Sequence, residues 1–391
     1  MPGPLAGITV LDLSRVMAGP WSGQMLADLG ADVIKVERPA VGDDTRAWGP
    51  PFLAGDEGPG GTSGYFLSVN RGKRSVTADM ATPQGRALIR HLATEADIVL
   101  ENFKAGTLAR HGLDHASLAK ANPGLITCSI TGFGQDGPRA AQPAYDFIVQ
   151  AMCGIMSITG GPEDQAGGGP QKVGVPIIDI MTGMYATVAV LAALERRHAT
   201  GLGDHIDLAM LDVGTAFLAN QAMNHLLTGK VPQRSGNRHP NIQPQNVYPC
   251  SDGDLALAVG NDRQFVKLCE VIGRDDLGSD SRFSSNAARV RHLAVLEPML
   301  VDAFSARAAG EWQTLLDAAG VPASRINSVA EALADPQIVH RNMVQRLPHA
   351  SGGDVPVVVS PLRFERNPIM YRRAAPMLGE DDAVMRANDR G

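Results

Sequence analysis

The amino-acid sequence predicts an α/β protein with a parallel sheet in its first half and a smaller, separate α+β domain after it. Short apolar strands alternate with helices over residues 8–210, which is the pattern of repeated βαβ units. The composition changes after Gly229, where residues 230–246 are rich in Pro, Asn, Gln and Gly. With 391 residues, of which 44% are hydrophobic, the chain can build two domains with substantial cores.

The elements of the first half follow from apolar runs and from helix start and stop signals. The first predicted βαβ unit consists of a strand at 8–13, a helix at 21–29 and a strand at 31–37. Thr82-Pro83 offers an N-cap followed by Pro at the first helical position, which predicts a helix from there to about residue 95. Further strands are predicted at 75–79, 97–101, 125–130 and 205–210, and a long apolar helix at 180–198 that Gly201 ends.

The second half predicts a small domain and a returning tail. Asp252-Gly253 indicates a hairpin over 248–259, and helices are expected at 263–272, 287–304 and 309–319. A strand-like run at 355–359 is expected to rejoin the first domain. The predicted division is therefore a large domain from 1–229, a linker at 230–246, a small domain at 247–335 and a C-terminal segment, 336–391, that returns to the large domain.

Charge and composition narrow the class of partner. The formal net charge of −6 argues against nucleic acid as the main partner. No apolar run of about 20 residues predicts a membrane span, and the N-terminus does not resemble a secretory signal, so we expect a cytoplasmic protein without a membrane partner. The four cysteines show no CxxC spacing, and no histidine has a second ligand nearby, so no disulfide framework or metal site is expected.

Asp179 is a lone carboxylate among apolar residues, in the run Pro176-Ile177-Ile178-Asp179-Ile180, where a long helix begins. An unpaired buried carboxylate costs several kcal/mol, roughly, before compensation. Such a residue either caps the helix with its side-chain oxygen or takes part in chemistry. The position alone leaves both interpretations open.

The opening βαβ unit also raises a dinucleotide-binding alternative. Glu37 ends the second strand, where an acidic residue would meet a ribose. However, the turn after the first strand contains Ala18-Gly19-Pro20-Trp21-Ser22-Gly23 and lacks the GxGxxG spacing. An NAD-dependent dehydrogenase therefore stays a remote alternative.

Several separated motifs resemble the family III CoA-transferases, which include formyl-CoA and carnitine CoA-transferases and the α-methylacyl-CoA racemases. The matching segments, in chain order, are residues 11–20, 26–39, 70–75, 101–103 and 129–134, followed by Asp179 with Gly183-Met184. The resemblance covers nearly the whole chain. It implies a large Rossmann-like CoA-binding domain, a smaller α+β domain and an interlocked homodimer.

The resemblance implies that Asp179 is the catalytic nucleophile. A carboxylate with a reference pKa of about 3.9 is ionised at neutral pH and can attack the carbonyl of an acyl-CoA thioester. The expected intermediates are an aspartyl anhydride and then an aspartyl-CoA thioester, from which a free carboxylic acid takes the CoA. Coenzyme A is then a co-substrate, and no metal and no tightly bound cofactor are required.

The same resemblance assigns the CoA site. Arg38 is expected at the nucleotide end, Val16, Met17 and Ala18 in the loop after the first strand, and Asn102, Phe103 and Arg110 in a second motif. Phosphate groups favour arginine and backbone donors. The cluster Arg71, Lys73 and Arg74 either extends this basic patch or forms a charged turn.

Two positions bear on the reaction and the substrate. Tyr145, before Asp146, stands where the racemases place the histidine of a His-Asp pair. A phenol with a reference pKa of about 10 is a poor base at neutral pH, so CoA transfer is favoured over the racemase/epimerase alternative. Tyr145 is expected to line the acyl pocket or the core.

Arg238 and His239 lie in a segment that resembles family members that use dicarboxylic acids and succinyl-CoA. They are candidates to bind the distal carboxylate of such an acid. A catalytically inactive CoA-binding protein is the third hypothesis.

Overall fold

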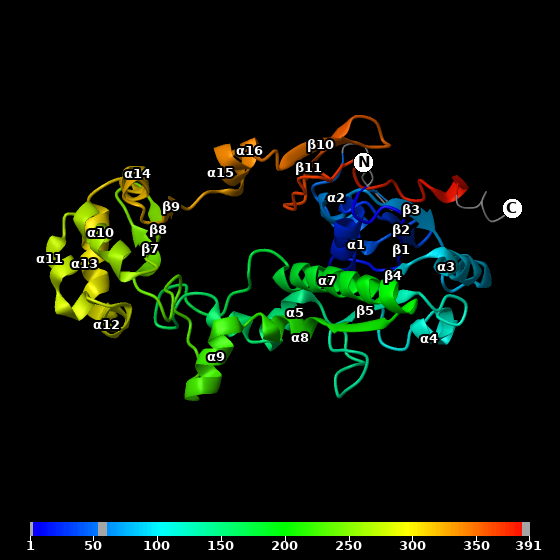
Figure 1. Ribbon diagram of the computed structural model, residues 1–391, viewed down its shortest axis with the longest axis horizontal. Coiled ribbons are helices and arrows are strands. Elements are labelled where there is room, and N and C mark those ends of the chain that lie inside the picture. Colours follow the sequence, from blue (N-terminus) through cyan, green and yellow to red (C-terminus); the bar gives the residue numbers. More distant parts are fainter. Residues whose placement is uncertain (1–2, 54–60, 385–391) are drawn as a thin grey trace. The chain divides into compact units, whose positions relative to one another are not determined.

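The structure is a computed structural model that describes residues 3–53 and 61–384, and its six-stranded parallel sheet confirms the predicted α/β class. The strands pair in the order β3-β2-β1-β4-β5-β6, and every pair is parallel (Figure 1). Their bounds are β1 (Thr9–Asp12), β2 (Asp32–Glu37), β3 (Arg74–Thr77), β4 (Ile98–Glu101), β5 (Ile126–Thr131) and β6 (His205–Ala209). This is the order of doubly wound nucleotide-binding folds, in which ligands bind where the order reverses, here between β1 and β4.

Helices cover both faces of the sheet because successive strand residues point to opposite faces. On one face, α1 (Ala18–Asp28) and α7 (Ile177–Thr200) pack with the side chains of Val10 and Leu100 in one buried cluster. On the other face, α3 (Pro83–Glu95) packs with Leu11 and Val99 in a second cluster. The apolar strands read from the sequence are thus buried on both sides, as parallel strands require.

Local signals set most helix ends. The side chain of Thr82 accepts a hydrogen bond from the backbone N–H of Gly85, as expected for the N-cap of α3. At the end of α7, Gly201 adopts a left-handed φ of 74° and donates its N–H to the carbonyl of Arg197. α1 begins at Ala18, three residues before the predicted start, because Pro20 is tolerated in the first turn of a helix.

The remaining elements include several that the sequence did not reveal. β7 (Gln245–Pro249) and β8 (Asp254–Ala258) form the predicted hairpin, and β9 (Ala323–Arg325) pairs with β8. β10 (Val344–Pro348) pairs with β11 (Asp354–Val358). The other helices are α2 (Gly64–Val69), α4 (His115–Leu118), α5 (Asp146–Met152), α6 (Ile155–Ile158), α8 (Met210–Ala216), α9 (Ala219–Thr228), α10 (Asp262–Val271), α11 (Asp275–Ser279), α12 (Asn286–Arg291), α13 (Leu293–Ser305), α14 (Ala309–Ala319), α15 (Val329–Ala334) and α16 (Pro336–His340). Short 3-10 helices occur at Asp44–Ala47, Ala109–His111 and Ser281–Phe283. The helix predicted at 287–304 is interrupted at His292, so that it forms α12 and α13.

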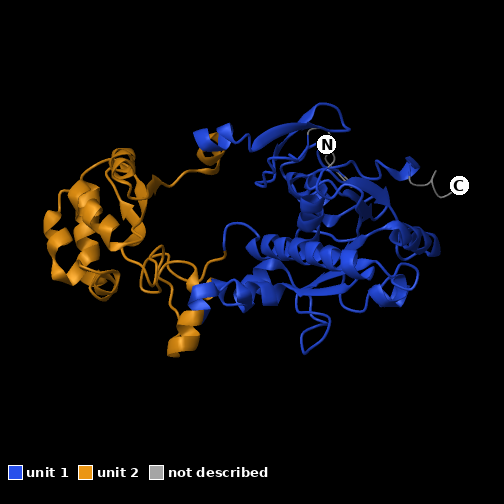
Figure 2. Cartoon of the chain, in the orientation of Figure 1, with its two compact units in different colours: residues 1–155, 173–222, 336–391 blue, residues 156–172, 223–335 orange. Residues whose placement is uncertain are grey.

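The chain divides into two compact units whose bounds differ from the predicted domains. Unit 1 contains residues 1–155, 173–222 and 336–391, and unit 2 contains residues 156–172 and 223–335 (Figure 2). The segment 230–246, predicted as a linker, belongs to unit 2, as does 156–172, which was predicted in the large domain. Hydrogen bonds join these two segments, from Gly236 N–H to the carbonyl of Gly160 and from Arg234 Nε to the carbonyl of Gly161.

The C-terminal segment returns to unit 1 and covers the edge strand β3. The carboxylate of Asp381 accepts a hydrogen bond from the backbone N–H of Ser75, and that of Asp382 accepts one from Thr77. The two aspartates thus accept hydrogen bonds from backbone N–H groups that would have no protein partner at an exposed sheet edge.

Within the described residues, α7 is long and apolar enough to cross a membrane by length and composition, with a mean hydropathy of 1.9. The apolar runs of the sequence predict no such segment. Buried helices of globular proteins pass the same test, and α7 packs along α1.

Candidate active site

Asp179 lies in the first turn of α7, with 9% of its surface exposed, and lines a cavity in unit 1. Within the part of the chain that the structure describes, no hydrogen bond or ion pair holds its carboxylate. The capping interpretation is wrong, because the N-cap position is Pro176 and no side chain there caps the helix. Instead, Asp146 Oδ1 accepts hydrogen bonds from the backbone N–H groups of Ile178, at 2.7 Å, and Asp179, at 3.2 Å.

Burial, and next the negative charge of Asp146, raise the pKa of Asp179 to about 7. The sequence alone predicts an ordinary carboxylate that is fully ionised at neutral pH. In the structure the group is half-protonated near pH 7, and its ionised form is more basic than an exposed aspartate. A carboxylate with this pKa, without a partner and facing a cavity, has the properties of an activated nucleophile.

This pKa predicts a pH dependence for the reaction of the free enzyme. The value of kcat/KM for an acyl-CoA is expected to rise with pH around a midpoint of about 7, because only the ionised Asp179 attacks a carbonyl. Asp146→Asn should move the midpoint to lower pH, since it removes the repelling charge but leaves an oxygen that can accept from Ile178. A wild-type profile that is flat from pH 5 to 9 would contradict the assignment.

The loop after β1 lines the same cavity, and the side chain of Asn102 is hydrogen-bonded to its backbone. Val16, Met17 and Ala18 face the cavity with Asp179. The side-chain amide of Asn102, after β4, accepts from the backbone N–H of Arg15 at 2.9 Å and donates to its carbonyl at 2.6 Å. Val16 has a φ of 72°, which is rare for a β-branched residue. These contacts hold an otherwise unfavourable backbone next to the nucleophile.

Buried charges lie behind this loop. Lys35 Nζ donates to the carbonyl of Ser14 at 2.8 Å and pairs with Asp43 at 2.9 Å, and Lys73 Nζ pairs with Asp12 at 2.8 Å. Burial lowers the pKa of Lys73 to about 8, although Asp12 opposes the shift. Lys73 is fully buried, and Arg71 pairs with buried Asp28, so neither of them forms an exposed basic patch. The second interpretation of that cluster, a charged turn, is favoured, because residues 71–72 form a turn and the charges of Arg71 and Lys73 are paired inside the protein.

Loss of one buried charge should destabilise the fold strongly. Lys73→Met is expected to lower the free energy of unfolding by about 3–5 kcal/mol, because it leaves Asp12 buried without its cation. The matched control is Arg196→Met, which breaks an exposed ion pair with Asp204 and should cost less than about 1 kcal/mol. Equal losses of stability in urea titrations of the two variants would contradict this account.

Two neighbouring cavities bring most of the predicted site residues together. The first, the Asp179 cavity, measures about 260 Å³ and is lined by seven of them, namely Val16, Met17, Ala18, Asn102, Phe103, Tyr145 and Asp179. The second, the Arg38 cavity, measures about 240 Å³. Arg15 and Phe103 line both, so the two cavities adjoin at this pair. Both lie entirely in unit 1, beyond the carboxyl ends of β1 and β4.

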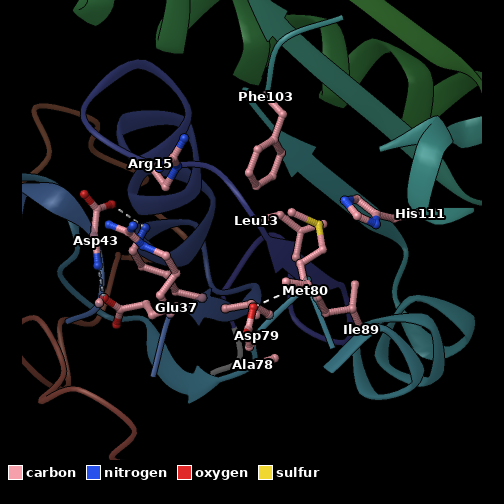
Figure 3. A pocket seen from close by; sticks show the side chains of 15 residues that line it. Leu13, Arg15, Glu37, Asp43, Ala78, Asp79, Met80, Ile89, Phe103 and His111 are labelled. Atoms are coloured by element: carbon pink, nitrogen blue, oxygen red, sulfur yellow. Dashed lines mark hydrogen bonds and ion pairs between the residues drawn. The ribbon is translucent and has the colours of Figure 1, made fainter. Parts of the chain in front are cut away.

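The lining of the Arg38 cavity combines apolar side chains with charged groups. Figure 3 shows Leu13, Met80, Ile89 and Phe103 around its open space, with Arg15 at the same end as Phe103 in this view. Arg38 forms an ion pair with Asp44, and half of its side chain is exposed. An apolar wall beside an arginine suits a ligand with a flat base and phosphate groups.

Three predicted residues lie outside both cavities. Arg110 is exposed, and its guanidinium donates to Thr107 Oγ1 at 3.3 Å. In unit 2, Arg238 pairs with Glu297 at 3.1 Å, and His239 Nδ1 accepts from the backbone N–H groups of Asn241 and Ile242. Their roles in binding stay predictions.

The structure also bears on the dehydrogenase and racemase alternatives. The carboxylate of Glu37 accepts hydrogen bonds from Arg46, at 2.7 Å from each of two nitrogens, from Ser75 Oγ and from the backbone N–H of Asp43, so it is occupied within the protein. It is not available to bind a ribose. Tyr145 lies at the N-cap of α5 with 62% of its surface exposed and lines the Asp179 cavity, where a racemase would need a base.

Arg15 and Asp44 line the Asp179 cavity and Tyr65 lies near Asp179, but the sequence singles out none of the three. Arg15 lies within the matched motif, directly before Val16, but an arginine in a loop is usually a solvated surface group. Tyr65 lies close enough to Asp179 that burial and this negative charge raise its pKa to about 12, so it stays a hydroxyl donor. Only the folded chain brings Tyr65 near Asp179, so no local signal identifies it.

Comparison with known proteins agrees with this geometry. The model of CoA-transferase family III matches residues 5–382. The chain is 49% identical over 384 residues to a succinate–glutarate CoA-transferase of Agrobacterium fabrum, covering 98% of this chain and 95% of that protein. It is 40% identical over 386 residues to an acetyl-CoA:oxalate CoA-transferase of Acetobacter aceti, covering 98% and 95%.

A crystal structure of a CAIB/BAIF family protein from Brucella suis shares the fold, with a TM-score of 0.86 and 47% identity, over 99% of this chain and 100% of that one. The similarity extends over both units and includes the segment that carries Asp179. The chain therefore belongs to CoA-transferase family III and is an enzyme that transfers coenzyme A from an acyl-CoA to a free carboxylic acid.

Proposed function

We propose that this CoA-transferase acts on dicarboxylic acids, with Asp179 as the nucleophile. The observation that carries the chemical part is the carboxylate itself, which is nine-tenths buried, has no partner among the described residues and has a pKa of about 7. The dicarboxylate class is supported by relatives that are named for succinate, glutarate and oxalate. Succinyl-CoA is the proposed donor.

The reaction runs in two half-reactions through Asp179. Its carboxylate attacks the thioester carbonyl, and the C–S bond breaks to give an aspartyl anhydride and CoA thiolate. The thiolate then attacks the aspartyl carbonyl, which releases the donor acid and leaves an aspartyl-CoA thioester. The acceptor carboxylate repeats these steps in reverse, so atoms and charge balance without an oxidant or reductant.

Backbone N–H groups at the start of α1 are the proposed oxyanion donors. Those of Met17, Ala18 and Gly19 make no hydrogen bond within the described residues. Gly183 lies one turn after Asp179, and a Cβ there would come within 2.6 Å of the carbonyl oxygen of Ala18, so this face of α7 meets the start of α1. Free amides at a helix N-terminus stabilise the negative charge of a tetrahedral intermediate.

CoA itself spans the two adjoining cavities in this proposal. Its adenosine occupies the Arg38 cavity against Leu13, Met80 and Phe103, and its pantetheine arm enters the Asp179 cavity. CoA is a co-substrate that leaves after each cycle, and we propose that no other cofactor is bound tightly.

We also propose a homodimer in the cytoplasm. On α7, the side chains of Met184, Tyr185 and Val188 are 41–64% exposed, and a cavity of about 780 Å³ with mostly apolar walls lies beside Trp21 and Met184. Contiguous exposed apolar surface of this kind usually marks an interface. A monomer on gel filtration at micromolar concentration would contradict the proposal.

The test is an exchange assay with purified enzyme, a panel of acyl-CoAs and free acids, and detection of new thioesters by mass. We expect succinyl-CoA to pass its CoA to glutarate or another dicarboxylate without added metal or nucleotide. Exchange confined to monocarboxylates would overturn the dicarboxylate proposal. If α-stereochemistry changed without exchange, the racemase alternative would replace it.

A further inference from the structure

Arg15 occupies the junction between the two cavities. Its guanidinium lies over the ring of Phe103, 5.3 Å from the centroid, and both residues line both cavities. The backbone of Arg15 is fixed on both sides by the amide of Asn102. The two hydrogen bonds fix the backbone from which this side chain extends, and its cation lies where the two cavities adjoin.

The hydrogen-bonding capacity of Arg15 is only partly used. Its Nε is buried and has no hydrogen-bond partner, and its Nη1 contacts Asp44 Oδ2 at 3.2 Å. Arg38 pairs with the other oxygen of the same carboxylate. Two arginines thus share one aspartate, which leaves a net positive charge at the junction and one buried donor without an acceptor. A buried donor without an acceptor carries a free-energy cost that an anionic ligand would remove.

We infer that Arg15 binds the pyrophosphate of CoA. In the ligand-free enzyme, the carboxylate of Asp44 binds Arg15 in place of the pyrophosphate. The inference rests on the proposed function, because it uses the placement of CoA across the two cavities. In CoA the pyrophosphate connects the adenosine to the pantetheine arm. A molecule with adenosine in one cavity and its thioester at Asp179 must therefore carry the pyrophosphate past Arg15.

The charge of the pyrophosphate and the exposure of Asp44 explain how the pyrophosphate can replace the Asp44 carboxylate on Arg15. A pyrophosphate carries two negative charges and several acceptor oxygens, so it can engage Arg15 Nη1 and the unused Nε together. Asp44 would then repel the ligand, but 40% of its side chain is exposed, so it can turn into solvent. The carboxylate keeps the two arginines close together before binding and competes with phosphate for them.

The test compares four probes that differ in their phosphates: CoA, dephospho-CoA, 4′-phosphopantetheine and pantetheine. Arg15→Gln should weaken CoA and dephospho-CoA by the same factor, about 10- to 100-fold, because both contain the pyrophosphate. It should lower kcat/KM much less for an acyl-pantetheine, which lacks the pyrophosphate, than for the matching acyl-CoA. Asp44→Asn should tighten CoA and dephospho-CoA by about 3- to 10-fold, since it removes the competing charge. Arg15→Lys should fall between wild type and Arg15→Gln.

Arg196→Gln is the matched control, because it removes one positive charge from an exposed ion pair away from both cavities and should leave all dissociation constants unchanged. Equal CoA affinity in wild type and Arg15→Gln would overturn the inference. If Arg15→Gln weakened the affinity for CoA but not for dephospho-CoA, the inference would also be overturned, since Arg15 would then bind the 3′-phosphate. A wild-type enzyme that binds no CoA would instead contradict the proposed function.

Discussion

Asp179→Asn is expected to abolish acyl transfer, with a fall in kcat of at least about a thousandfold, because an amide cannot form the anhydride. CoA binding should persist, since the residues proposed to hold the nucleotide and pyrophosphate lie elsewhere. The assay is thioester exchange by mass together with CoA binding by calorimetry. Asp212→Asn, an exposed aspartate in the first turn of α8, is the control and should keep wild-type activity.

The same substitution should stabilise the protein at neutral and higher pH. The pKa of Asp179 is raised from 3.8 to about 7 in the folded state, so the folded protein binds more protons than the unfolded chain between these values. This contribution to stability is present below pH 3.8 and is lost as the pH rises through 7. Asp179→Asn has no group at this position that must lose a proton, so it does not lose this stability. Its free energy of unfolding should exceed that of the wild type by an amount that grows with pH to at most about 4 kcal/mol.

Urea titrations of the wild type and the variant at pH 5 and pH 8 measure this difference. The advantage of Asp179→Asn should be larger at pH 8. A variant that is less stable than the wild type at pH 8 would show that Asp179 holds the helix rather than straining it. That result is what a capping role would give.

Gly183→Ala is expected to impair catalysis although it changes a residue outside the cavity lining. The added methyl group would lie 2.6 Å from the carbonyl oxygen of Ala18 and 2.9 Å from Trp21 Cβ. Because the first contact is with backbone, α7 must move away from α1, which separates Asp179 from the proposed oxyanion donors. A displacement of about 1 Å at such a site costs about 100-fold in rate, so kcat should fall by about 10- to 100-fold.

The control for Gly183→Ala is Val190→Ala, which opens a cavity in the buried face of the same helix. It should lower stability by about 1–3 kcal/mol but leave kcat of the folded enzyme unchanged. The dissociation constant for CoA should be near wild type in both variants. If the two variants lost kcat in equal measure, the fall would reflect general destabilisation, and the contact at Gly183 would have no special role.

The sheet could be predicted because its signals are local. Apolar strands such as 31–37 and the Thr82-Pro83 helix start depend on a few neighbouring residues, and the structure reproduces them. The short helices could not be predicted, since α2 has six residues and α6 has four. The tail segment 381–382 and the join between 156–172 and 234–236 depend on contacts far apart in sequence, which no periodicity reveals.

The residues of the site that lie in sequence motifs could be predicted. Asp179, the loop at 16–18 and Asn102 were identified by resemblance, and the structure brings them to one cavity. The motifs do not reveal how deeply each side chain is buried or which charges and hydrogen-bond partners surround it. The raised pKa of Asp179 comes from burial and from Asp146, and the cap of α7 comes from a residue 32 positions earlier. Such effects require the folded arrangement.

The most direct test of the central claim is to trap the covalent intermediate on Asp179. Wild-type enzyme mixed with an acyl-CoA is treated with hydroxylamine or borohydride during turnover, and the tryptic peptide 173–196 is analysed by mass. The account predicts a modified Asp179 that requires acyl-CoA and does not form in Asp179→Asn. An enzyme that turns over at full rate with this peptide unmodified, or with the modification on another residue, would contradict it.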